Sequence, residues 1–466
     1  MLFSSISFLY YFLPLVLIIY FITPKKYKNY ILFLASIFFY FYGEPRYLWL
    51  LLLSCFMNYF FGFLIHNSTE SNAQKNYLII SIILNISLLF YFKYTNFFVS
   101  NLNSIFGFDL SFINVYMPIG ISFFTFQAMS YVIDVYRKEV PANKNFISFS
   151  TYVSLFPQLV AGPIVRYTTI NNELKERNHS LSLFALGTRR FLIGLAKKVL
   201  IANTIGELCY LLAYSIEISV LSKWIEAISF TLQIYFDFSG YSDMAIGLGL
   251  IFGFKFLENF NYPYISKSIT EFWRRWHISL SSWLRDYIYL PLGGNRVPKI
   301  KWIRNIIIVW FLTGFWHGAS YNFILWGLYF AFILIIEKLF LTNFLKKHKI
   351  LGLFYTLFFV IISFVIFNGD NLTIPLSNLK TMFGLNNYPL YNKEIIYYLK
   401  SYKYILLLAF ISSTPYPKII IENFKKNRIL NNLISFIEPI YLLLILILVT
   451  TFLIDASFNP FLYFRF

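Results

Sequence analysis

Long apolar runs recur along the whole chain, from residue 6 to residue 454, and they limit what it can fold into. A helix that crosses the hydrocarbon core of a membrane needs about 20 mostly apolar residues. The runs are continuous and do not alternate with polar residues, so they predict helices and exclude a transmembrane barrel. We expect an all-α, polytopic transmembrane helical bundle. Its candidate crossings are 6–22, 30–43, 46–64, 77–97, 115–135, 146–163, 182–205, 221–238, 240–256, 303–317, 320–340, 350–368, 402–413 and 431–454.

Several of these runs are short or broken, so we expect about eleven to thirteen true crossings. The polar stretches between them are too short to form a separate soluble domain. The sequence therefore predicts one integral membrane domain over residues 1–466, whose chemistry takes place within or at the edge of the membrane. No internal repeat of the kind that many transporters show is evident in the sequence.

The first apolar run lacks the basic region and the cleavage site of a signal peptide, so it is predicted to remain as the first helix. Lys25, Lys26 and Lys28 follow it directly, and the positive-inside rule then places this loop in the cytoplasm and the N-terminus outside. The net charge of +18 is spread over short loops beside the spans and does not indicate a nucleic-acid partner. Cys55 and Cys209 lie in apolar segments and are expected to be packed thiols.

The segment 270–290 is too charged for a simple crossing, because it contains Arg274, Arg275 and Arg285. Wound as one helix at about 100° per residue, it gathers aromatic and aliphatic side chains on one face and arginine and serine on the other. This pattern predicts an interfacial amphipathic helix. His277 falls on the border between the faces, where its ring can touch both a dry cavity and water. The pattern is equally typical of a helix that only anchors the protein through its tryptophans.

A second histidine, His317, ends one apolar run and begins the next, between Gly314 and Gly318. Ionisable residues inside a membrane are rare and usually functional, because burying them is costly. A neutral imidazole with a pKa near about 6.5 suits a general base that takes a proton from a hydroxyl or a thiol. The alternative is a histidine that hydrogen-bonds within the bundle and holds helices together.

Two carboxylates, Asp237 and Asp243, lie between apolar runs. They could pair with nearby arginines, orient a histidine, or lie in a short loop that caps the following helix. The five histidines are scattered and there is no cysteine cluster, so no metal site is expected. The sequence also lacks a Gly-rich phosphate loop and a Gly-x-Ser-x-Gly elbow.

Long and specific motifs occupy 124–127 (FTFQ), 130–137 (SYVIDVYR), 156–166 (FPQLVAGPIVR), 235–243 (YFDFSGYSD), 272–287 (FWRRWHISLSSWLRDY), 291–296 (PLGGNR) and 316–319 (WHGA). Together they resemble the membrane-bound O-acyltransferase (MBOAT) family. Within the family, the chain is similar to the branch of membrane subunits for alginate and peptidoglycan O-acetylation. The resemblance runs from residue 1 to about residue 340, with its core motifs in 117–330, and then fades.

The resemblance implies a helical fold with a central catalytic cavity, in which His317 matches the family's catalytic histidine and His277 its upstream partner. Members of this branch take an acyl group, usually acetyl, from a cytoplasmic donor and pass it across the bacterial cytoplasmic membrane. A separate periplasmic or extracellular acetyltransferase then places it on a polysaccharide hydroxyl. One departure is Phe367-Asn368, where many relatives carry Phe-Arg.

The resemblance makes acetyl-CoA the expected acyl donor, as a substrate and not as a bound cofactor. Arg274, Arg275 and Arg285 are the residues expected to hold its diphosphate by charge-assisted hydrogen bonds, helped by basic residues in 299–304. D-alanyl transfer to teichoic acid is an alternative that the motifs match less well. A flippase or transporter would need a polar pathway across the bilayer, whereas the sequence offers one imidazole-centred site. Peptidoglycan and an alginate-like polymer both stay open as the acceptor.

Overall fold

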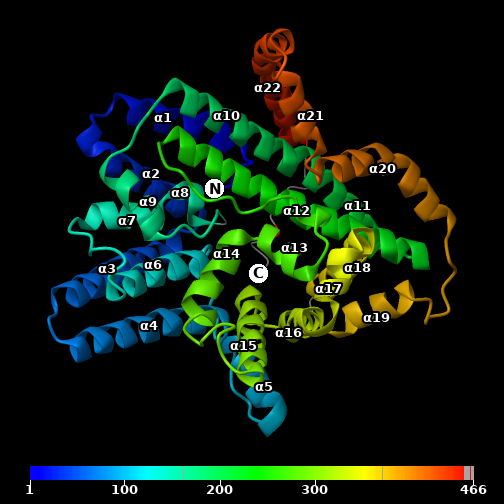
Figure 1. The fold of residues 1–466 in the computed structure, drawn as a ribbon, viewed down its shortest axis with the longest axis horizontal. Helices are drawn as coiled ribbons and strands as arrows, with labels where there is room; N and C mark the ends of the chain where they lie inside the picture. Colours follow the sequence, from blue (N-terminus) through cyan, green and yellow to red (C-terminus); the bar gives the residue numbers. More distant parts are fainter. Residues whose placement is uncertain (161, 370, 456–461, 463–466) are drawn as a thin grey trace. The chain divides into compact units, whose positions relative to one another are not determined.

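Figure 1 shows the chain in a computed structural model, which describes residues 1–160, 162–369, 371–455 and 462. All regular secondary structure in this described part is helical, which confirms the predicted all-α class. The chain divides into two compact units. The first contains Met1–Phe191 and Met244–Leu257, and the second contains Leu192–Asp243 and Glu258–Phe466.

The first unit is built from helices of up to 23 residues. They are η1 (Phe8–Phe12), α1 (Leu13–Ile22), η2 (Lys25–Tyr27), α2 (Lys28–Gly43), η3 (Pro45–Tyr47), α3 (Leu48–Asn67), α4 (Ser71–Lys93), α5 (Thr95–Phe106), α6 (Ile121–Tyr136), α7 (Phe146–Ser154), α8 (Phe156–Leu159) and α9 (Tyr167–Lys175). Helix α10 (Leu181–Ala196) begins in the first unit and ends in the second.

The second unit holds all of the histidine and arginine site residues expected from the sequence. Its helices are η4 (Lys197–Ala202), α11 (Asn203–Ala213), most of α12 (Val220–Ile251), η5 (Pro263–Ile265), α13 (Ile269–Arg275), α14 (Ile278–Leu284), η6 (Arg285–Tyr289), α15 (Lys299–His317), α16 (Tyr321–Ile336), η7 (Glu337–Leu341), α17 (Thr342–Lys347), α18 (Lys349–Phe367), α19 (Thr373–Met382), α20 (Lys393–Ser412), α21 (Tyr416–Lys425) and α22 (Arg428–Asp455).

Six helical stretches are long and apolar enough to cross a membrane, so the chain is a multi-pass membrane protein. They are Pro45–Asn67, Ser71–Lys93, Tyr321–Lys347, Lys349–Phe367, Lys393–Ser412 and Arg428–Asp455. Each overlaps a predicted crossing, and the shorter helix Phe8–Ile22 is apolar as well. The total of about eleven to thirteen stays a prediction, because the other apolar runs form helices that are shorter or more charged.

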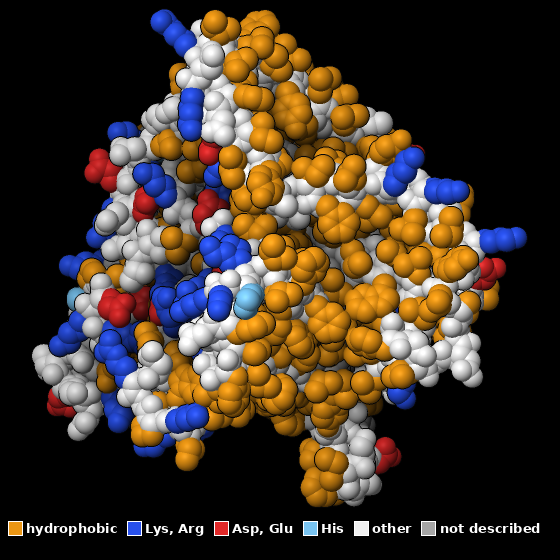
Figure 2. Space-filling model, turned by 45° about the vertical axis from the view of Figure 1, so that its right-hand side comes forward, with side chains coloured by type: hydrophobic (Ala, Val, Ile, Leu, Met, Phe, Trp, Pro, Cys, Tyr) orange, Lys and Arg blue, Asp and Glu red, His pale blue; other side chains and the backbone are white. Residues whose placement is uncertain are grey.

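Some of these helices leave most of their apolar surface uncovered by the rest of the protein, as expected for contact with lipid. Only 11% of the most apolar window of α20, and of α22, is buried. Figure 2 shows hydrophobic side chains spread over a broad face of the molecule. Such a face would cause association in water, whereas lipid tails can cover it without cost.

The expected boundary between the crossings 221–238 and 240–256 is wrong. The structure runs one 32-residue helix, α12, through both segments. No proline interrupts it, and Gly240 serves packing instead of a turn, since a Cβ there would lie 2.7 Å from the carbonyl oxygen of Gly194. Asp237 and Asp243 therefore lie within a helix and not in a capping loop.

Helices α15 and α16 pack unusually closely through two glycines. A Cβ on Gly314 would collide with the carbonyl oxygen of Phe323, and a Cβ on Gly327 would collide with that of Trp310. The backbones of the two helices thus touch where small residues allow it, a common device in membrane bundles. This contact fixes the end of α15, where His317 lies.

Helices α16 and α18 run antiparallel beside each other. At one end, the Asn322 side chain donates to the carbonyl oxygen of Gly369, at 2.6 Å, just past the end of α18. Near the middle, the Tyr329 hydroxyl donates to the carbonyl oxygen of Phe359, at 2.8 Å. The beginning of α16 therefore lies at the same level as the end of α18.

We expect Gly327→Ala to lower the thermal stability of the protein, because α15 and α16 must separate to admit the methyl group. Overpacking of this kind costs about 1–3 kcal/mol. The measurement is the Tm of the detergent-solubilised protein, followed by intrinsic fluorescence. Leu328→Ala is the control, since Leu328 neighbours Gly327 on α16 and is 37% exposed. Equal Tm values for Gly327→Ala and the wild type would show that the close contact is not required.

Candidate active site

The segment expected to form one amphipathic helix over 270–290 is broken at His277. Helix α13 ends at Arg275 and α14 begins at Ile278, while His277 has a left-handed backbone with φ of 43°. The single helix is therefore wrong, as is the place of His277 on the border of its faces. A left-handed backbone is strained for a residue with a side chain, and such strain gathers at functional sites.

Backbone contacts with the preceding loop explain the break. The Ile278 N–H donates to the carbonyl oxygen of Asn259, at 3.0 Å, and the Asn261 N–H donates to that of Arg275, at 2.9 Å. These two bonds take the place of helical bonds, so the chain turns at His277 instead of continuing as a helix.

The start of α13 is held by a buried carboxylate from a distant helix. Glu337, which is 2% exposed, accepts hydrogen bonds from the backbone N–H groups of Ile269, at 2.6 Å, and Thr270, at 3.0 Å. The first N–H groups of a helix have no partner within the helix, and a carboxylate there also complements the helix dipole. Glu337 thus fixes the segment that leads to His277.

Asn259 sets the protonation of the His277 ring. Its Oδ1 accepts from the Ser279 N–H, at 3.2 Å, and from the Ser279 hydroxyl, at 2.9 Å, while its amide nitrogen donates to Ser242. An oxygen in that position can only accept, and His277 Nδ1 lies 3.2 Å from it. The proton of the neutral ring is therefore on Nδ1, and Nε2 carries the lone pair.

Burial also keeps this ring neutral. His277 is 1% exposed, and this burial lowers its pKa to about 3 because the charged form loses its hydration. At neutral pH, His277 is a hydrogen-bond acceptor through Nε2 and not a cation.

His317 lies at the end of α15 inside an aromatic cage and is 6% exposed. The centroid of its ring lies 5.0 Å from that of Trp316, 5.0 Å from that of Trp326 and 5.3 Å from that of Phe367. The Trp316 ring also contacts His277, with centroids 6.2 Å apart. One indole therefore touches both histidines, which are separated by forty residues in the sequence.

Two of the three expected arginines share a cavity of about 530 Å³, which we name the cationic cavity. Arg274, Arg285 and Lys338 line it, and all three are exposed. Its apolar wall includes Trp273, whose buried indole N–H has no hydrogen-bond partner in the described structure. The cavity combines exposed cations with an apolar wall.

The third expected arginine is engaged elsewhere. Arg275 forms an ion pair with Glu271, at 2.9 Å, and donates to the carbonyl oxygen of Asn261. It does not line the cationic cavity, and neither do the basic residues of 299–304. The structure therefore brings Arg274 and Arg285 together and separates Arg275 from them.

Two carboxylates of α12 form ion pairs with lysines. Asp237 forms an ion pair with Lys198 at 2.7 Å, with both side chains 2% exposed, and Asp243 pairs with Lys197 at 2.7 Å. Because both lysines follow α10, these pairs join α12 to the end of that helix. Among the residues that the structure describes, no three His, Cys, Asp or Glu side chains are grouped to hold a metal ion.

Sequence patterns did not reveal Asn259, Glu337, Lys338 or Trp326. Each lies outside the expected site or carries no distinctive spacing, and its contact with the site comes from another part of the chain. The free cysteines are as expected, since Cys55 and Cys209 are both buried.

The model of the MBOAT, membrane-bound O-acyltransferase family matches residues 37–378. The chain belongs to this family. The match includes both histidines and both cavity arginines, and it extends beyond residue 340, where the resemblance was expected to fade. As a member of the MBOAT family, the protein is an acyltransferase.

Similar proteins within the family carry different activities in their names. The chain is 42% identical to a probable alginate O-acetylase of Pseudomonas aeruginosa, over 84% of this chain and 76% of the relative. It is 40% identical to a peptidoglycan O-acetyltransferase of Helicobacter pylori, over 83% of this chain and 80% of the relative. It is 30% identical to a teichoic acid D-alanyltransferase of Bacillus subtilis, over 55% of this chain and 70% of the relative.

The lowered pKa of His277 predicts a pH dependence of stability. Between about pH 3 and about pH 6.5 the unfolded chain binds a proton at this residue that the folded protein excludes. The free energy of unfolding should therefore fall as the pH drops through this window, by on the order of 1 kcal/mol per unit.

The check is the Tm of the wild type and of His277→Gln at several pH values from about 7.5 to about 5. We expect a smaller acid loss in His277→Gln, which cannot titrate. His348→Gln removes an exposed histidine and should behave like the wild type. Parallel curves for all three proteins would contradict a neutral, buried His277.

Proposed function

We propose that the protein is a membrane O-acetyltransferase. It takes an acetyl group from a cytoplasmic thioester donor and passes it across the bacterial cytoplasmic membrane for O-acetylation of a cell-wall or extracellular polysaccharide. A separate extracytoplasmic acetyltransferase completes the transfer to the polymer. The high identity to O-acetylases of alginate and peptidoglycan, over most of each chain, supports acetyl over D-alanyl.

The proposal rests on the contact of both histidine rings with the indole of Trp316, at a place between two cavities. The cationic cavity includes Leu334 and Lys338, at the end of the α16 stretch. A second cavity includes Phe364, Asn368 and Gly369, at the end of α18. Because α16 and α18 are antiparallel, the two cavities lie toward opposite ends of the pair, with about 24 Å of helix from Asn322 to Lys338.

Such an arrangement suits a group transfer from one side of a membrane to the other. A phosphate-bearing donor stays at the cationic end, and an acceptor approaches from the other end. Trp273 lines the cationic cavity and contacts Trp326, which contacts His317, while Phe367 contacts His317 beside the second cavity. His317 thus lies between the two cavities, in contact with Trp326 on the side of the cationic cavity and with Phe367 on the side of the second cavity.

In the proposed mechanism, His317 is the general base. It takes the proton of the acceptor hydroxyl as the oxygen attacks the thioester carbonyl carbon. The new C–O bond forms, the C–S bond breaks, and the proton passes from the imidazolium to the leaving thiolate. The buried indole N–H of Trp326, which has no partner in the described structure, is placed to stabilise the oxyanion. A covalent route, in which His317 carries the acetyl group itself, would instead leave an acyl-imidazole.

His277 acts as the partner of His317 in this proposal. Asn259 holds its Nδ1–H, so Nε2 keeps its lone pair, and the ring contacts Trp316. A neutral acceptor orients the reacting groups without adding a positive charge that would lower the basicity of His317. We further propose that both units form one MBOAT domain, which the family match across both units supports. We also propose that its N-terminus lies outside, because Lys25, Lys26 and Lys28 follow the first helix.

We expect His317→Ala to abolish acetylation, because general base catalysis contributes about 10²–10⁴-fold. The measurement is base-labile acetate on isolated cell wall and on secreted polysaccharide. A deletion strain is complemented with the wild type, His317→Ala or His348→Ala at equal membrane expression. Full restoration by His317→Ala would refute the catalytic role, and unchanged acetate on every polymer in the deletion strain would refute the enzyme proposal.

For the donor site, we expect Arg274→Gln and Arg285→Gln each to weaken binding of labelled acetyl-CoA by about tenfold, since each loses a charge-assisted hydrogen bond. Arg275→Gln is the matched control, because Arg275 pairs with Glu271 outside the cationic cavity. A loss of binding confined to Arg275→Gln would contradict this assignment. If the purified wild type ignores acetyl-CoA, the donor is a carrier protein, as the D-alanyl alternative requires.

A further inference from the structure

A group of cations gathers in the first unit where α1 ends and α2 begins. Lys28, the first residue of α2, is 8% exposed, and its ammonium lies 4.2 Å from the centroid of the Tyr20 ring. The guanidinium of Arg177, in the loop before α10, lies 6.0 Å from the centroid of the same ring. Lys25, in η2, is exposed and close enough to act on the charge of Lys28. We name Lys25, Lys28 and Arg177 the cation cluster.

Hydrogen bonds from three separate segments hold the frame of the cluster. The Tyr20 hydroxyl, which is fully buried, donates to the carbonyl oxygen of Phe252, at 2.9 Å. His179 Nε2 lies 2.9 Å from the same hydroxyl, and the Lys28 ammonium donates to the carbonyl oxygen of Tyr20, at 3.2 Å. The cluster therefore differs from a set of mobile surface side chains, because buried contacts fix its position.

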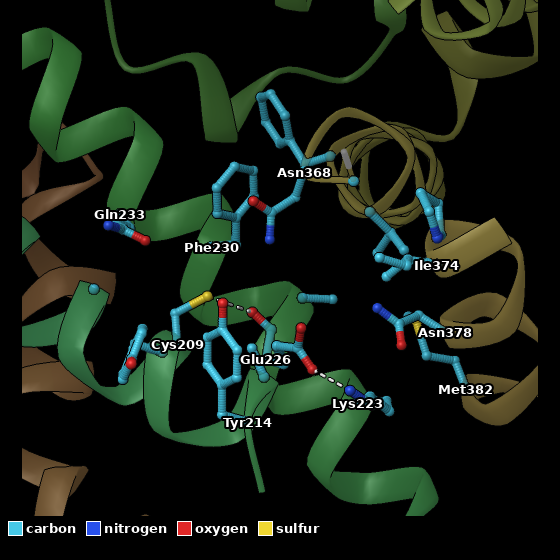
Figure 3. Close-up of a pocket in the computed structure, with 18 of the residues that line it drawn as sticks. Cys209, Tyr214, Lys223, Glu226, Phe230, Gln233, Asn368, Ile374, Asn378 and Met382 are labelled. Atoms are coloured by element: carbon cyan, nitrogen blue, oxygen red, sulfur yellow. Dashed lines mark hydrogen bonds and ion pairs between the residues drawn. The ribbon is translucent and has the colours of Figure 1, made fainter. Parts of the chain in front are cut away.

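The cation cluster lacks the anionic partner that other buried lysines of the protein have. Lys223, for example, pairs with Glu226 at 2.8 Å, as Figure 3 shows. Within the described residues, no carboxylate forms an ion pair with a member of the cation cluster. The Arg177 Nη1 is also buried without a hydrogen-bond partner there. Because buried charge is costly without a counter-charge, the cluster requires an anion from outside the chain.

The positive potential of the cluster acts on the neighbouring histidine. Burial lowers the pKa of His179, and the charges of Lys28, Arg177 and Lys25 lower it further. The pKa of Lys28 is itself lowered by burial and then by Arg177 and Lys25. Neither shift is opposed by a carboxylate, so the charge of the cluster is not compensated within the protein.

The surroundings of the cluster favour a lipid headgroup over a dissolved anion. Phe21 and Ile22, at the end of α1, are 41% and 78% exposed, and Leu34 and Phe38 on α2 are 61% and 55% exposed. Lipid tails can cover such an apolar surface, and the exposed Tyr27 beside the cluster is typical of the membrane interface. A lipid with its tails along this surface would carry its phosphate to the level of the cluster.

We propose that the cation cluster binds the phosphate of an anionic phospholipid, which joins the end of α1, the start of α2 and the loop before α10. In the described structure no side chain caps the start of α2, so the positive end of its helix dipole adds to the attraction. A zwitterionic headgroup would bring its own cation into a site that has no carboxylate for it. The inference does not rest on the proposed function.

The test measures the Tm of the full-length protein in nanodiscs of phosphatidylcholine alone or of an equal mixture with phosphatidylglycerol. We expect the Tm of the wild type to be about 3 °C higher in the mixture, because a ligand of the folded protein raises its stability. Lys28→Gln and Arg177→Gln should each lose at least about half of this rise. Lys26→Gln should keep all of it, because Lys26 is exposed in the same turn and lies by the Tyr27 ring.

Native mass spectrometry of protein released from the mixed nanodiscs measures lipid retention directly. We expect the wild type and Lys26→Gln to retain phosphatidylglycerol at least about tenfold more often than Lys28→Gln or Arg177→Gln. Lys25→Gln keeps the test decisive if a substitution of a buried cation prevents folding. Lys25 is exposed, and its loss should still reduce both the rise in Tm and the retention.

Three outcomes would overturn the inference. The first is an unchanged Tm of the wild type in the mixture, and the second is an equal rise in the wild type and all variants, which would indicate general attraction to a charged membrane. The third is an equal rise when inorganic phosphate is added to phosphatidylcholine nanodiscs at constant ionic strength, which would assign the cluster to a dissolved anion. None of these outcomes bears on acetylation that depends on His317, so the two proposals fail separately.

Discussion

The cost of burying polar groups decides the architecture of the second unit. Glu337, far along the chain, caps the start of α13, and Asn259 accepts the hydrogen bonds that turn the backbone at His277. Lys198 and Asp237, both almost inaccessible, tie α12 to η4, which follows α10. Each group depends on specific protein partners, because water cannot replace them in an apolar surrounding. These specific contacts therefore hold the histidines in fixed positions.

Aromatic side chains complete the site by surrounding the histidines. Trp316 contacts both rings, and Trp326 and Phe367 contact His317. In the proposed reaction, this cage would keep water away from a thioester donor beside a base. The same packing keeps His277 neutral, which leaves its Nε2 lone pair available at neutral pH.

The two cavities beside this aromatic cage differ in the charge of their lining residues. Exposed cations line the cationic cavity, whereas the second cavity, at the end of α18, is lined by amides and by the ion pair of Lys223 with Glu226. The antiparallel packing of α16 against α18 sets these environments at opposite ends of the same helices. Asn368 lies in the wall of this second cavity, so a charged residue there would change the charge of its lining.

The sequence by itself determined the helical membrane class, the acyltransferase family and the choice of His277 and His317. Apolar runs and local motifs encode these features within short segments. Only the tertiary structure decided the break at His277, the continuity of α12, the separation of Arg275 from Arg274 and the roles of Asn259 and Glu337. Each of these depends on contacts between residues distant in sequence, such as the Glu337 carboxylate on the Ile269 N–H. Helical periodicity describes one segment of the sequence at a time, so it cannot reveal a hydrogen-bond or ion-pair partner that comes from another segment.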